Sequence, residues 1–345
     1  KKVVASAIAA KESIREEKDW TVEGPGNIGG RINCMAIDPG NSNVMFVGNA
    51  SGGVFKTTDG GNNWFPVFDQ QPFLAIGAIT IDPSNHETIW VGTGDLNISG
   101  YPFIGDGVYK SIDGGINWTH MGLEAQSIVS KIIVDPSNTD IIYASTMGIP
   151  FFESTDRGLY KSTDGGLTWT KKLFVSENAG VIDMVMNPAN PQVIYAASWN
   201  RIRNNETSMV YGPDSHIYKT TDGGNTWVTV PNPPGVSNFI PFNMCGLKDG
   251  SNLIFIMLYT NSNKCFKTSD YGTTWTQEIV PPQASSSIRL MQFINPTLGF
   301  AGGAGGVFLR YGNSIGITQI NSELPSEYNL GQNYPNPFNP STTID

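Results

Sequence analysis

Residues Ser162-Thr-Asp164-Gly-Gly-Leu-Thr-Trp169 carry a pattern that occurs five times in this chain. The other four copies are Thr57-Thr-Asp59-Gly-Gly-Asn-Asn-Trp64, Ser111-Ile-Asp113-Gly-Gly-Ile-Asn-Trp118, Thr220-Thr-Asp222-Gly-Gly-Asn-Thr-Trp227 and Thr268-Ser-Asp270-Tyr-Gly-Thr-Thr-Trp275. Successive aspartates are 54, 51, 58 and 48 residues apart. A near-constant period of this length is the signature of a repeat architecture, so each copy marks one supersecondary unit.

Strand-like segments surround each copy in a constant order. An apolar run that ends in a Pro turn comes first, as at residues 36–41, and a second short apolar run such as 141–144 follows. A third run, for example 158–161, leads into the Asp motif, and a fourth leaves from its Trp. Asp-Pro-x-Asn favours a turn because Pro fixes φ and Asx side chains bond nearby backbone. Four antiparallel strands per period predict an all-β fold built from β-propeller blades.

The number of units predicts the number of blades. A sixth unit without the Asp motif covers residues 288–294, 299–303 and 306–310. Residues 19–22 have the pattern of a fourth strand whose blade has no beginning, so we expect this N-terminal strand to complete the sixth blade and close the ring. We therefore predict a single propeller of six four-stranded antiparallel blades, with seven blades as the alternative.

The Asp motif has a structural role that needs no ligand. Its carboxylate can accept hydrogen bonds from its own turn, Gly supplies positive φ, and Trp covers the gap between neighbouring sheets. Calcium binding is the alternative, but each motif offers one carboxylate where a calcium site needs several oxygens, so we predict no metal and no cofactor. The residues with this structural role are Asp59, Trp64, Asp113, Trp118, Asp164, Trp169, Asp222, Trp227, Asp270 and Trp275.

Composition narrows the function classes. The chain of 345 residues has 21 basic and 30 acidic side chains, a net charge of −9, which argues against nucleic acid and anionic membrane surfaces as partners. The longest apolar run, residues 253–259, predicts a strand and is too short to insert into a membrane. Cys34, Cys245 and Cys265 have no metal-ligand or redox spacing, so we expect three buried thiols, with one disulfide as the alternative.

The repeated motif resembles that of the Asp-box (BNR) propellers. Among these propellers, it is most similar to the secreted sortilin-like bacterial group with glycosyl hydrolase repeats. The resemblance covers roughly residues 20–310 and includes the opening Trp20-x-x-x-Gly-Pro-Gly-Asn-Ile-Gly-Gly-Arg31 and the first-blade segment 51–61. It implies the propeller fold; activity varies too widely on one fold to transfer with it.

The C-terminal segment is a separate signal. Residues 323–344 are dense in Pro and Asn, which predicts an extended segment. They resemble the opening of the C-terminal sorting domain of type IX secretion substrates, which implies a Bacteroidetes-type cell, the type IX secretion machinery as a partner, and a secreted or outer cell-surface location. We divide the chain into a polar leader at 1–19, partly helical or disordered, a propeller at 20–320 and a truncated sorting segment at 321–345.

Loops between second and third strands predict the ligand face. They are short in blades one, five and six but long in blades two to four, at 92–107, 146–158 and 199–215. Binding residues concentrate on such loops. Candidate ligand-binding residues are Trp199, Arg201, Arg203, Tyr101, Phe103, Phe151, Phe152, Arg157 and Tyr211, and the candidate carboxylates are Asp95, Asp106, Glu153 and Asp156. We single out Trp199, which the repeat does not account for.

The sequence lacks residues that three classes of hydrolase need. A sialidase needs an arginine cluster, but the sequence has seven Arg in all and lacks an Arg-Ile-Pro opening after Gly30. In xyloglucanase-like inverting glycosidases an Asp precedes the first-blade Val-Gly-Gly, and Ala50 stands at that place here. No nucleophile elbow is present, and His86, His120 and His216 lie in turn or strand contexts.

These observations favour a secreted, non-catalytic propeller that binds a protein, peptide or glycan on the long loops, as a monomer. The alternative is a glycoside hydrolase acting on an extracellular polysaccharide through two of the candidate carboxylates. The second alternative is a purely structural surface propeller.

Overall fold

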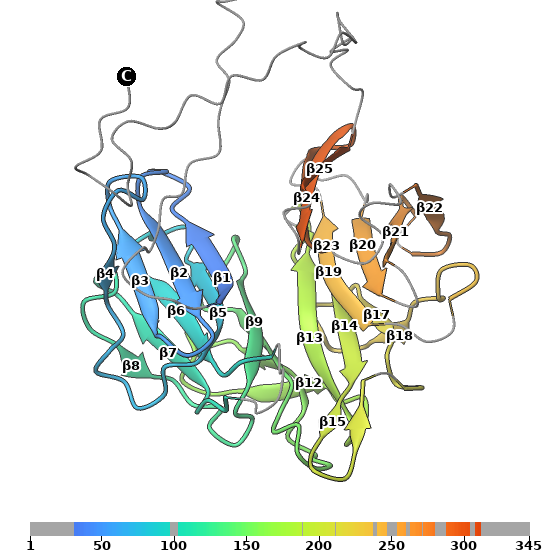
Figure 1. The fold of residues 1–345 in the computed structure, drawn as a ribbon, viewed down its shortest axis with the longest axis horizontal. Helices are drawn as coiled ribbons and strands as arrows, with labels where there is room; N and C mark the ends of the chain where they lie inside the picture. Colours follow the sequence, from blue (N-terminus) through green and yellow to red (C-terminus); the bar gives the residue numbers. More distant parts are fainter. Residues whose placement is uncertain are drawn as a thin grey trace, which may run out of the picture. The chain divides into compact units, whose positions relative to one another are not determined.

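The computed structural model describes residues 31–96, 103–187, 189–210, 212–236, 240–246, 254–259, 263–270, 272–279, 288–303 and 308–311. Within these ranges every regular element is a β-strand (Figure 1). The predicted leader, the closing strand at 19–22 and the sorting segment all lie outside the described residues, so these expectations stay predictions.

The strands form a series of antiparallel meanders in chain order. Sheet 1 contains β1 (Ile32–Ile37), β2 (Met45–Asn49), β3 (Val54–Thr57) and β4 (Phe65–Pro66). Sheet 2 contains β5 (Ile76–Ile81), β6 (Ile89–Thr93), β7 (Val108–Ser111) and β8 (Thr119–His120). Sheet 3 contains β9 (Val129–Val134), β10 (Ile142–Thr146), β11 (Gly158–Ser162) and β12 (Thr170–Leu173).

The second half of the chain continues the pattern with one insertion. Sheet 4 contains β13 (Ala179–Met186), β14 (Ile194–Asn200), β17 (Ile217–Thr220) and β18 (Val228–Thr229). The inserted hairpin contains β15 (Ile202–Arg203) and β16 (Ser208–Met209). Sheet 5 contains β19 (Ile240–Gly246), β20 (Ile254–Tyr259), β21 (Asn263–Thr268) and β22 (Thr276–Glu278). Sheet 6 contains the three described strands β23 (Ile288–Asn295), β24 (Leu298–Gly303) and β25 (Phe308–Tyr311).

The predicted fold class is confirmed: the chain is an all-β propeller with four-stranded antiparallel sheets. The first strands of successive sheets contact one another from β1 through β23. Six sheets are described, and the total number of blades stays a prediction. All six first strands carry a register shift near the end at which they begin, which bends each strand at the same place.

Each Asp motif forms a compact turn held by its own side chains. In the third copy, the hydroxyl of Ser162 donates to Asp164 at 2.7 Å and accepts the backbone N–H of Gly166 at 2.8 Å. The Asp164 carboxylate also accepts the backbone N–H of Thr168 at 2.9 Å and its hydroxyl at 2.5 Å. Both Gly residues of this turn have positive φ, 72° and 92°, which is why Gly is needed at these places. All of these hydrogen bonds join residues of the turn itself.

The turn also joins neighbouring sheets. The second Gly packs so closely on the preceding sheet that a Cβ at Gly166 would lie 2.6 Å from the Trp90 ring. The indole of Trp169 donates to the Met121 carbonyl of the preceding sheet at 2.7 Å, and Trp118 does the same to Val67. Each motif Trp of this kind closes the outer end of an interface between two sheets.

A lysine at the third strand forms a second inter-sheet contact, which we call the lysine latch. Lys56, Lys110 and Lys161 each lie over an aromatic ring of the second strand in their own sheet, at 5.3, 4.7 and 5.1 Å from the ring centroid. Each also donates to the first Gly carbonyl of the next Asp turn, at 2.8, 3.4 and 2.9 Å. In sheet 5, followed by a sheet without the Asp motif, Lys267 instead pairs with Glu278 at 2.5 Å and with the Tyr311 hydroxyl.

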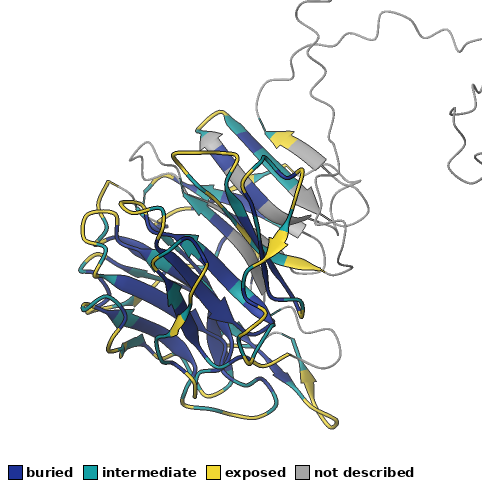
Figure 2. Cartoon of the chain, turned by 90° about the vertical axis from the view of Figure 1, so that its left-hand side faces the viewer, coloured by how far each residue is buried: buried dark blue, intermediate teal, exposed yellow. Residues whose placement is uncertain are grey.

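Apolar side chains fill the space between adjacent sheets. Figure 2 colours many residues of these strands as buried. The cluster between sheets 1 and 2 joins Phe46 and Val54 to Ile76, Ile79 and Ile81. Equivalent clusters join sheets 2 and 3, sheets 3 and 4, and sheets 4 and 5. The core is therefore a row of similar interfaces, each made by the second strand of one sheet and the first strand of the next.

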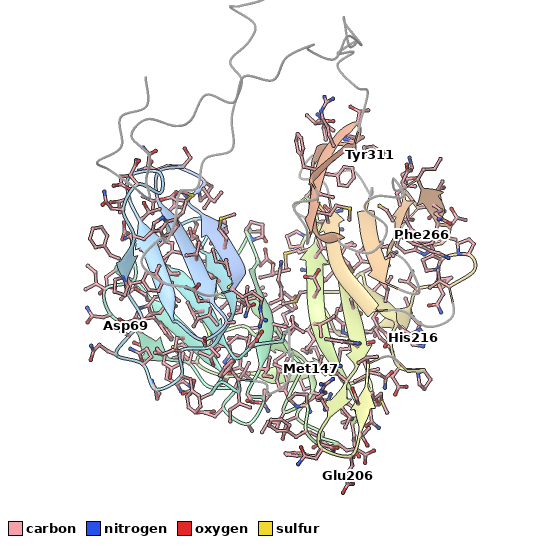
Figure 3. All side chains as sticks on the ribbon, in the orientation of Figure 1. Asp69, Met147, Glu206, His216, Phe266 and Tyr311 are labelled. Carbon is pink, nitrogen blue, oxygen red and sulfur yellow. The ribbon has the colours of Figure 1, made fainter. Side chains whose placement is uncertain are left out.

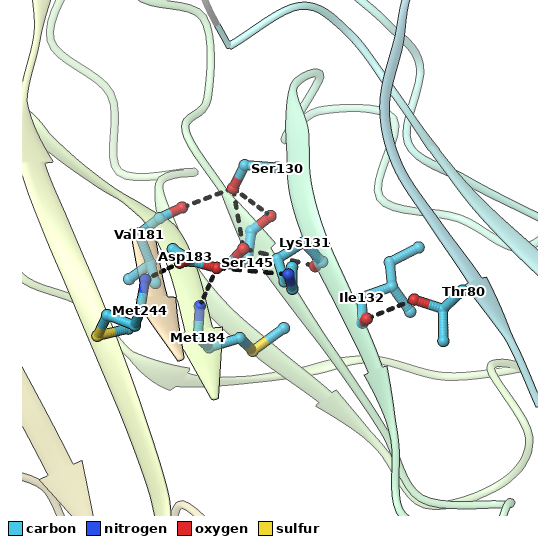
Figure 4. A network of polar contacts seen from close by, with 9 residues as sticks. All are labelled: Thr80, Ser130, Lys131, Ile132, Ser145, Val181, Asp183, Met184 and Met244. Carbon is cyan, nitrogen blue, oxygen red and sulfur yellow. Dashed lines mark hydrogen bonds and ion pairs between the residues drawn. The ribbon is translucent and has the colours of Figure 1, made fainter. Parts of the chain in front are cut away.

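A polar network crosses the first strands of the central sheets (Figure 4). The Asp183 carboxylate accepts the Met244 N–H of the next sheet at 2.9 Å, and the Lys131 ammonium of the preceding sheet lies 3.6 Å from it. The Ser130 hydroxyl bonds Ser145 and donates to the Val181 carbonyl at 3.0 Å. These contacts satisfy buried polar atoms and link three sheets in series.

The three cysteines are free thiols, so the disulfide alternative is not found. Cys265 is buried, whereas Cys34 and Cys245 are half-buried, which corrects the expectation of three buried thiols for those two. Desolvation by burial raises the pKa of both the Cys34 and the Cys265 thiol to about 12, which disfavours the reactive thiolate.

The first prediction concerns the lysine latch. Replacing Lys161 with Met removes a charge-assisted hydrogen bond and a ring contact, so we expect a loss of about 1–2 kcal/mol in the free energy of unfolding by urea. Lys264→Met, outside the latch position, is the control. Equal effects of the two substitutions would contradict the latch.

The second prediction concerns acid stability. Hydrogen bonds from the residue four positions along, Thr168, Thr274 or Asn117, lower the pKa of Asp164, Asp270 and Asp113 to about 2. The pKa of an Asp in the unfolded chain is about 3.9. These carboxylates therefore stabilise the folded state fully above that pH, and the stabilisation is lost as the pH falls through about 2.

Unfolding midpoints measured from pH 6 to pH 2 should therefore fall mainly below pH 4. Asp164→Asn should flatten this dependence, whereas Asp140→Asn, at an exposed carboxylate in a neighbouring turn, should leave it unchanged. A slope that is the same in both variants would rule out the Asp turns as its source.

Candidate functional site

The long loops of sheets 2, 3 and 4 connect second to third strands, as predicted, and lie at the ends of the strands opposite the Asp turns. The Asp turns instead contact the Pro turns: the Gly165 N–H donates to the Asp140 carbonyl at 3.0 Å, and Gly60 and Gly114 make the same contact. We call the end of the sheets that carries the long loops the loop face.

Asp95, a candidate carboxylate, is buried on the loop face and already engaged. Its carboxylate forms an ion pair with Arg31, which precedes β1, and accepts the Asn33 side-chain amide at 3.0 Å. Asn33 also donates to the Ile76 carbonyl. Asp95 therefore ties the start of sheet 1 to sheet 2. Arg31 and Asn33 were not among the predicted site residues, since their distance in sequence from the long loops gave no signal.

Asp106 is held within its own loop. It accepts the Tyr109 hydroxyl at 2.7 Å and the Thr93 hydroxyl at 3.2 Å, and its backbone carbonyl bonds the His120 ring. Burial, followed by the bond to Asp106, raises the pKa of Tyr109 above its usual range, so this phenol stays protonated. Asp106 thus orders the loop between β6 and β7.

Arg157 differs most from its predicted role, because its side chain is fully buried and cannot touch a ligand. Its guanidinium donates to the carbonyls of Arg201 at 2.9 Å, Phe152 at 3.0 Å, and Ile149 and Asn178 at 3.2 Å. Gly148, at φ 70°, leaves room for it: a Cβ there would lie 2.7 Å from Arg157 Cγ. Burial, opposed by the charge of Glu153, lowers the pKa of Arg157 to about 10.

This guanidinium is a hub for three segments of the loop face. It joins the loop 147–157, the connection 174–178 between β12 and β13, and the chain after β14. Further bonds strengthen the junction: the Arg203 N–H donates to the Pro150 carbonyl at 2.7 Å, and the Asn178 side chain donates to Glu153 at 3.1 Å. A single buried cation therefore fixes the loops of sheets 3 and 4.

Trp199 was expected on the longest loop, and the structure corrects this. It lies within β14, paired with Gly180, because this strand is one or two residues longer than the second strands of the other sheets. Its ring packs, partly buried, with a small apolar cluster of Ile128, Met147 and Ile182. Its indole donates to the Val210 carbonyl at 2.6 Å, so the repeat does not explain Trp199 but the inserted hairpin does.

Arg201 is likewise buried, with its guanidinium 5.1 Å from the centroid of the Trp199 ring. Burial, and then the nearby charge of Arg203, lowers the pKa of Arg201. Arg203 is half-buried and donates to the Ser208 hydroxyl across the β15–β16 hairpin, whose tip carries Glu206 (Figure 3).

The remaining candidates divide by exposure. Phe103, Phe152 and Glu153 are exposed, and Phe151 and Asp156 are half-buried. Tyr101 and Tyr211 lie outside the described residues. Surface available to a ligand in the described part of the loop face thus includes two phenylalanine rings and one carboxylate, whereas Arg157, Arg201 and Asp95 act inside the protein.

The described ranges contain neither a cluster of metal-ligating side chains nor a membrane-spanning helix. No group of three or more His, Cys, Asp or Glu side chains there is placed to hold a metal ion. Among the same residues there is no helix long and apolar enough to cross a membrane.

Comparisons with known proteins agree on the fold. The GH74 xyloglucanase of Xanthomonas campestris superimposes with a TM-score of 0.64 at 14% identity, covering 81% of this chain and 44% of that one. The GH74 enzyme of Niastella koreensis gives a TM-score of 0.60 at 20% identity, with the same two coverages. At these identities the likeness supports the β-propeller architecture alone.

Relatives found by sequence are also xyloglucanases. The xyloglucanase Xgh74A of Acetivibrio thermocellus is 24% identical over 248 residues, 65% of this chain and 28% of that protein. Xyloglucanases of Paenibacillus sp. and Hypocrea jecorina are each 23% identical, over 271 and 263 residues. The chain spans only about a quarter to three tenths of these relatives. No family model matches the sequence.

The third prediction tests the arginine hub. Arg157→Met leaves four carbonyls without their donor, so we expect a loss of about 2–4 kcal/mol in the free energy of unfolding. Arg157→Lys should be nearly as harmful, because an ammonium cannot reproduce the planar fork.

Arg203→Met, at a half-buried arginine in the same region, is the matched control, with an expected loss below about 1 kcal/mol. If the two methionine variants unfold at the same urea concentration, Arg157 is not the hub of these loops.

Proposed function

We propose that the chain is the propeller of a secreted glycoside hydrolase that acts on an extracellular polysaccharide of the xyloglucan type. The observation that carries this proposal is the run of about 250 residues matched to xyloglucanases, in a chain whose sheets share their fold. The proposal reverses the order of the two leading hypotheses drawn from the sequence. The relatives extend far beyond the matched part, so the activity is assigned here as a hypothesis for this chain.

The loop face of sheets 2 to 4 is the proposed substrate side. Exposed Phe103 and Phe152 offer flat apolar surface on which sugar rings can stack, and the Glu153 carboxylate lies beside Phe152 in the chain. Of the four candidate carboxylates only Glu153 is exposed, so we assign it the first contact with substrate. Hydrolysis needs an acid and a second carboxylate, for which the half-buried Asp106 and Asp156 remain candidates.

A second function, recognition of polysaccharide without hydrolysis, is favoured by a specific observation. Ala50 stands at the place where the xyloglucanase-like pattern has its Asp. Its methyl group is buried, and its backbone N–H donates to the Arg31 carbonyl. Asp95 and Asp106 are bonded to neighbouring side chains. A binding propeller needs the aromatic surface but not a catalytic pair.

The location and the finer family are also proposals. We assign the chain to the Asp-box propellers on its five repeated turns, and to secretion through the type IX machinery on residues 323–344. The domain limits 1–19, 20–320 and 321–345 and the monomeric state are part of the same proposal.

The fourth prediction separates the two functions. The purified chain is incubated with xyloglucan, and newly released reducing ends are measured, with unsubstituted cellulose as the comparison substrate. A hydrolase should release reducing ends, and Glu153→Gln should lower the rate at least about 100-fold if this carboxylate takes part in proton transfer.

Binding is followed in parallel by mobility in xyloglucan-containing native gels. Phe152→Ala and Phe103→Ala should each weaken retardation severalfold, whereas Phe65→Ala, at an equally exposed ring beside the first Asp turn, should not. Retardation without hydrolysis would select the binding function. Neither retardation nor hydrolysis would reject both.

A further inference from the structure

Two exposed phenylalanine rings lie on neighbouring segments of the loop face, and the sequence indicated only one of them. Phe152 lies in the long loop of sheet 3 and is 55% exposed. Phe174 directly follows β12, in the connection to β13, and is 45% exposed. Leu173 and Val175, on either side of Phe174, both pack in the apolar cluster between sheets 3 and 4. The exposed ring of Phe174 therefore stands out from a segment that is otherwise anchored in the core.

The two segments are bonded directly to each other. The backbone N–H of Ser154 donates to the Glu177 carbonyl at 2.9 Å. The buried Arg157 guanidinium donates to the Phe152 carbonyl at 3.0 Å and to the Asn178 carbonyl at 3.2 Å, so one side chain holds both segments. The two phenylalanines are thus fixed on one surface before any ligand arrives, which lowers the entropic cost of binding.

Lys171 of β12 holds the Phe174 ring beside the long loop. Its half-buried ammonium lies 5.3 Å from the centroid of that ring and 5.4 Å from the centroid of the Tyr160 ring. The same ammonium donates to the Thr155 carbonyl, three residues after Phe152. A ring held by a cation in this way keeps its place at the surface without being buried.

The exposed charges on these two segments have the same sign. Among residues 149–157 and 174–178, the exposed charged side chains are Glu153 and Glu177. These carboxylates would repel an anionic sugar, whereas they can accept hydrogen bonds from the hydroxyl groups of an uncharged one. The flat apolar face of a sugar ring can pack on an aromatic ring. The chemistry of this surface therefore fits uncharged sugar residues.

We propose that Phe152 and Phe174 form one stacking site for uncharged sugar residues of a polysaccharide, with Lys171 as the positioning residue of Phe174. The inference rests on the proposed function and deepens it, because it adds a second aromatic ring and its cation to the substrate side. Two rings on one surface contact a longer stretch of polysaccharide than a single ring. Loss of either ring therefore weakens binding while the other ring stays in place.

The test measures how strongly xyloglucan retards the chain in native gels of increasing polysaccharide concentration. Phe174→Ala should raise the concentration that halves the mobility about two- to tenfold, because one stacking surface is lost. Phe174→Trp keeps an aromatic ring and should bind at least as well as the unchanged chain. Phe65→Ala, at an exposed ring beside the first Asp turn, is the matched control and should bind like the unchanged chain.

Two further measurements separate binding from folding. The thermal midpoint of Phe174→Ala should stay within about 2 °C of the unchanged chain, because an exposed ring contributes little to stability. Lys171→Met should weaken retardation, and Lys171→Arg, which keeps a cation over the ring, should restore it. Equal retardation of the Met and Arg variants would overturn the positioning role of Lys171.

The outcomes distinguish this site from the proposed function. If xyloglucan retards the unchanged chain and Phe174→Ala equally, the site is overturned and the proposed function stands. If xyloglucan does not retard the unchanged chain, the site is also overturned, and the release of reducing ends alone decides the proposed function. Gels that contain polygalacturonate test the charge argument, because an acidic polysaccharide should not retard the chain. Equal retardation by the two polysaccharides would overturn the assignment to uncharged sugars.

Discussion

The structure depends on one contact, which the chain makes at each of the first three steps from sheet to sheet. A second-strand aromatic packs on the first strand of the next sheet, a lysine lies over that aromatic, and the lysine bonds the next Asp turn. The turn holds its second Gly against the same aromatic, and only Gly fits there. Because one group takes part in several contacts, sheet spacing is set by local chemistry and not by the loops.

Because the contacts between sheets are made near the Asp turns, the loops at the opposite ends of the strands are free to vary in length. Loops between second and third strands range from the few residues at 50–53 to the β15–β16 insertion without disturbing the sheets. The long loops are then ordered by buried polar side chains of their own, with Arg157 bonded to four carbonyls of three segments. The buried guanidinium holds the loop face together and leaves phenylalanine rings on its surface, an arrangement that fits the proposed contact with a polysaccharide.

Much of the fold followed from the sequence, whereas the site followed only in part. The Asp turns, the strand order and the long loops were predicted because each is encoded by a local pattern of Asp, Gly, Pro and Trp. The same reasoning placed Arg157, Arg201 and Asp95 in a ligand site, and all three are buried. A charged residue in a long loop can bind a ligand, or it can form hydrogen bonds that hold the loop itself. The local sequence does not distinguish these two roles. The carbonyls that Arg157 bonds lie up to 44 residues away.

By itself the sequence determined the repeating unit, its turn chemistry and the face on which the loops would lengthen. These features depend on contacts between residues within about ten positions of one another, which are close in space because they are close in the sequence. Tertiary structure decided which polar side chains form hydrogen bonds within the protein and are unavailable to a ligand, because their partners come from other sheets. It also decided the role of Trp199, a strand residue bonded to the inserted hairpin.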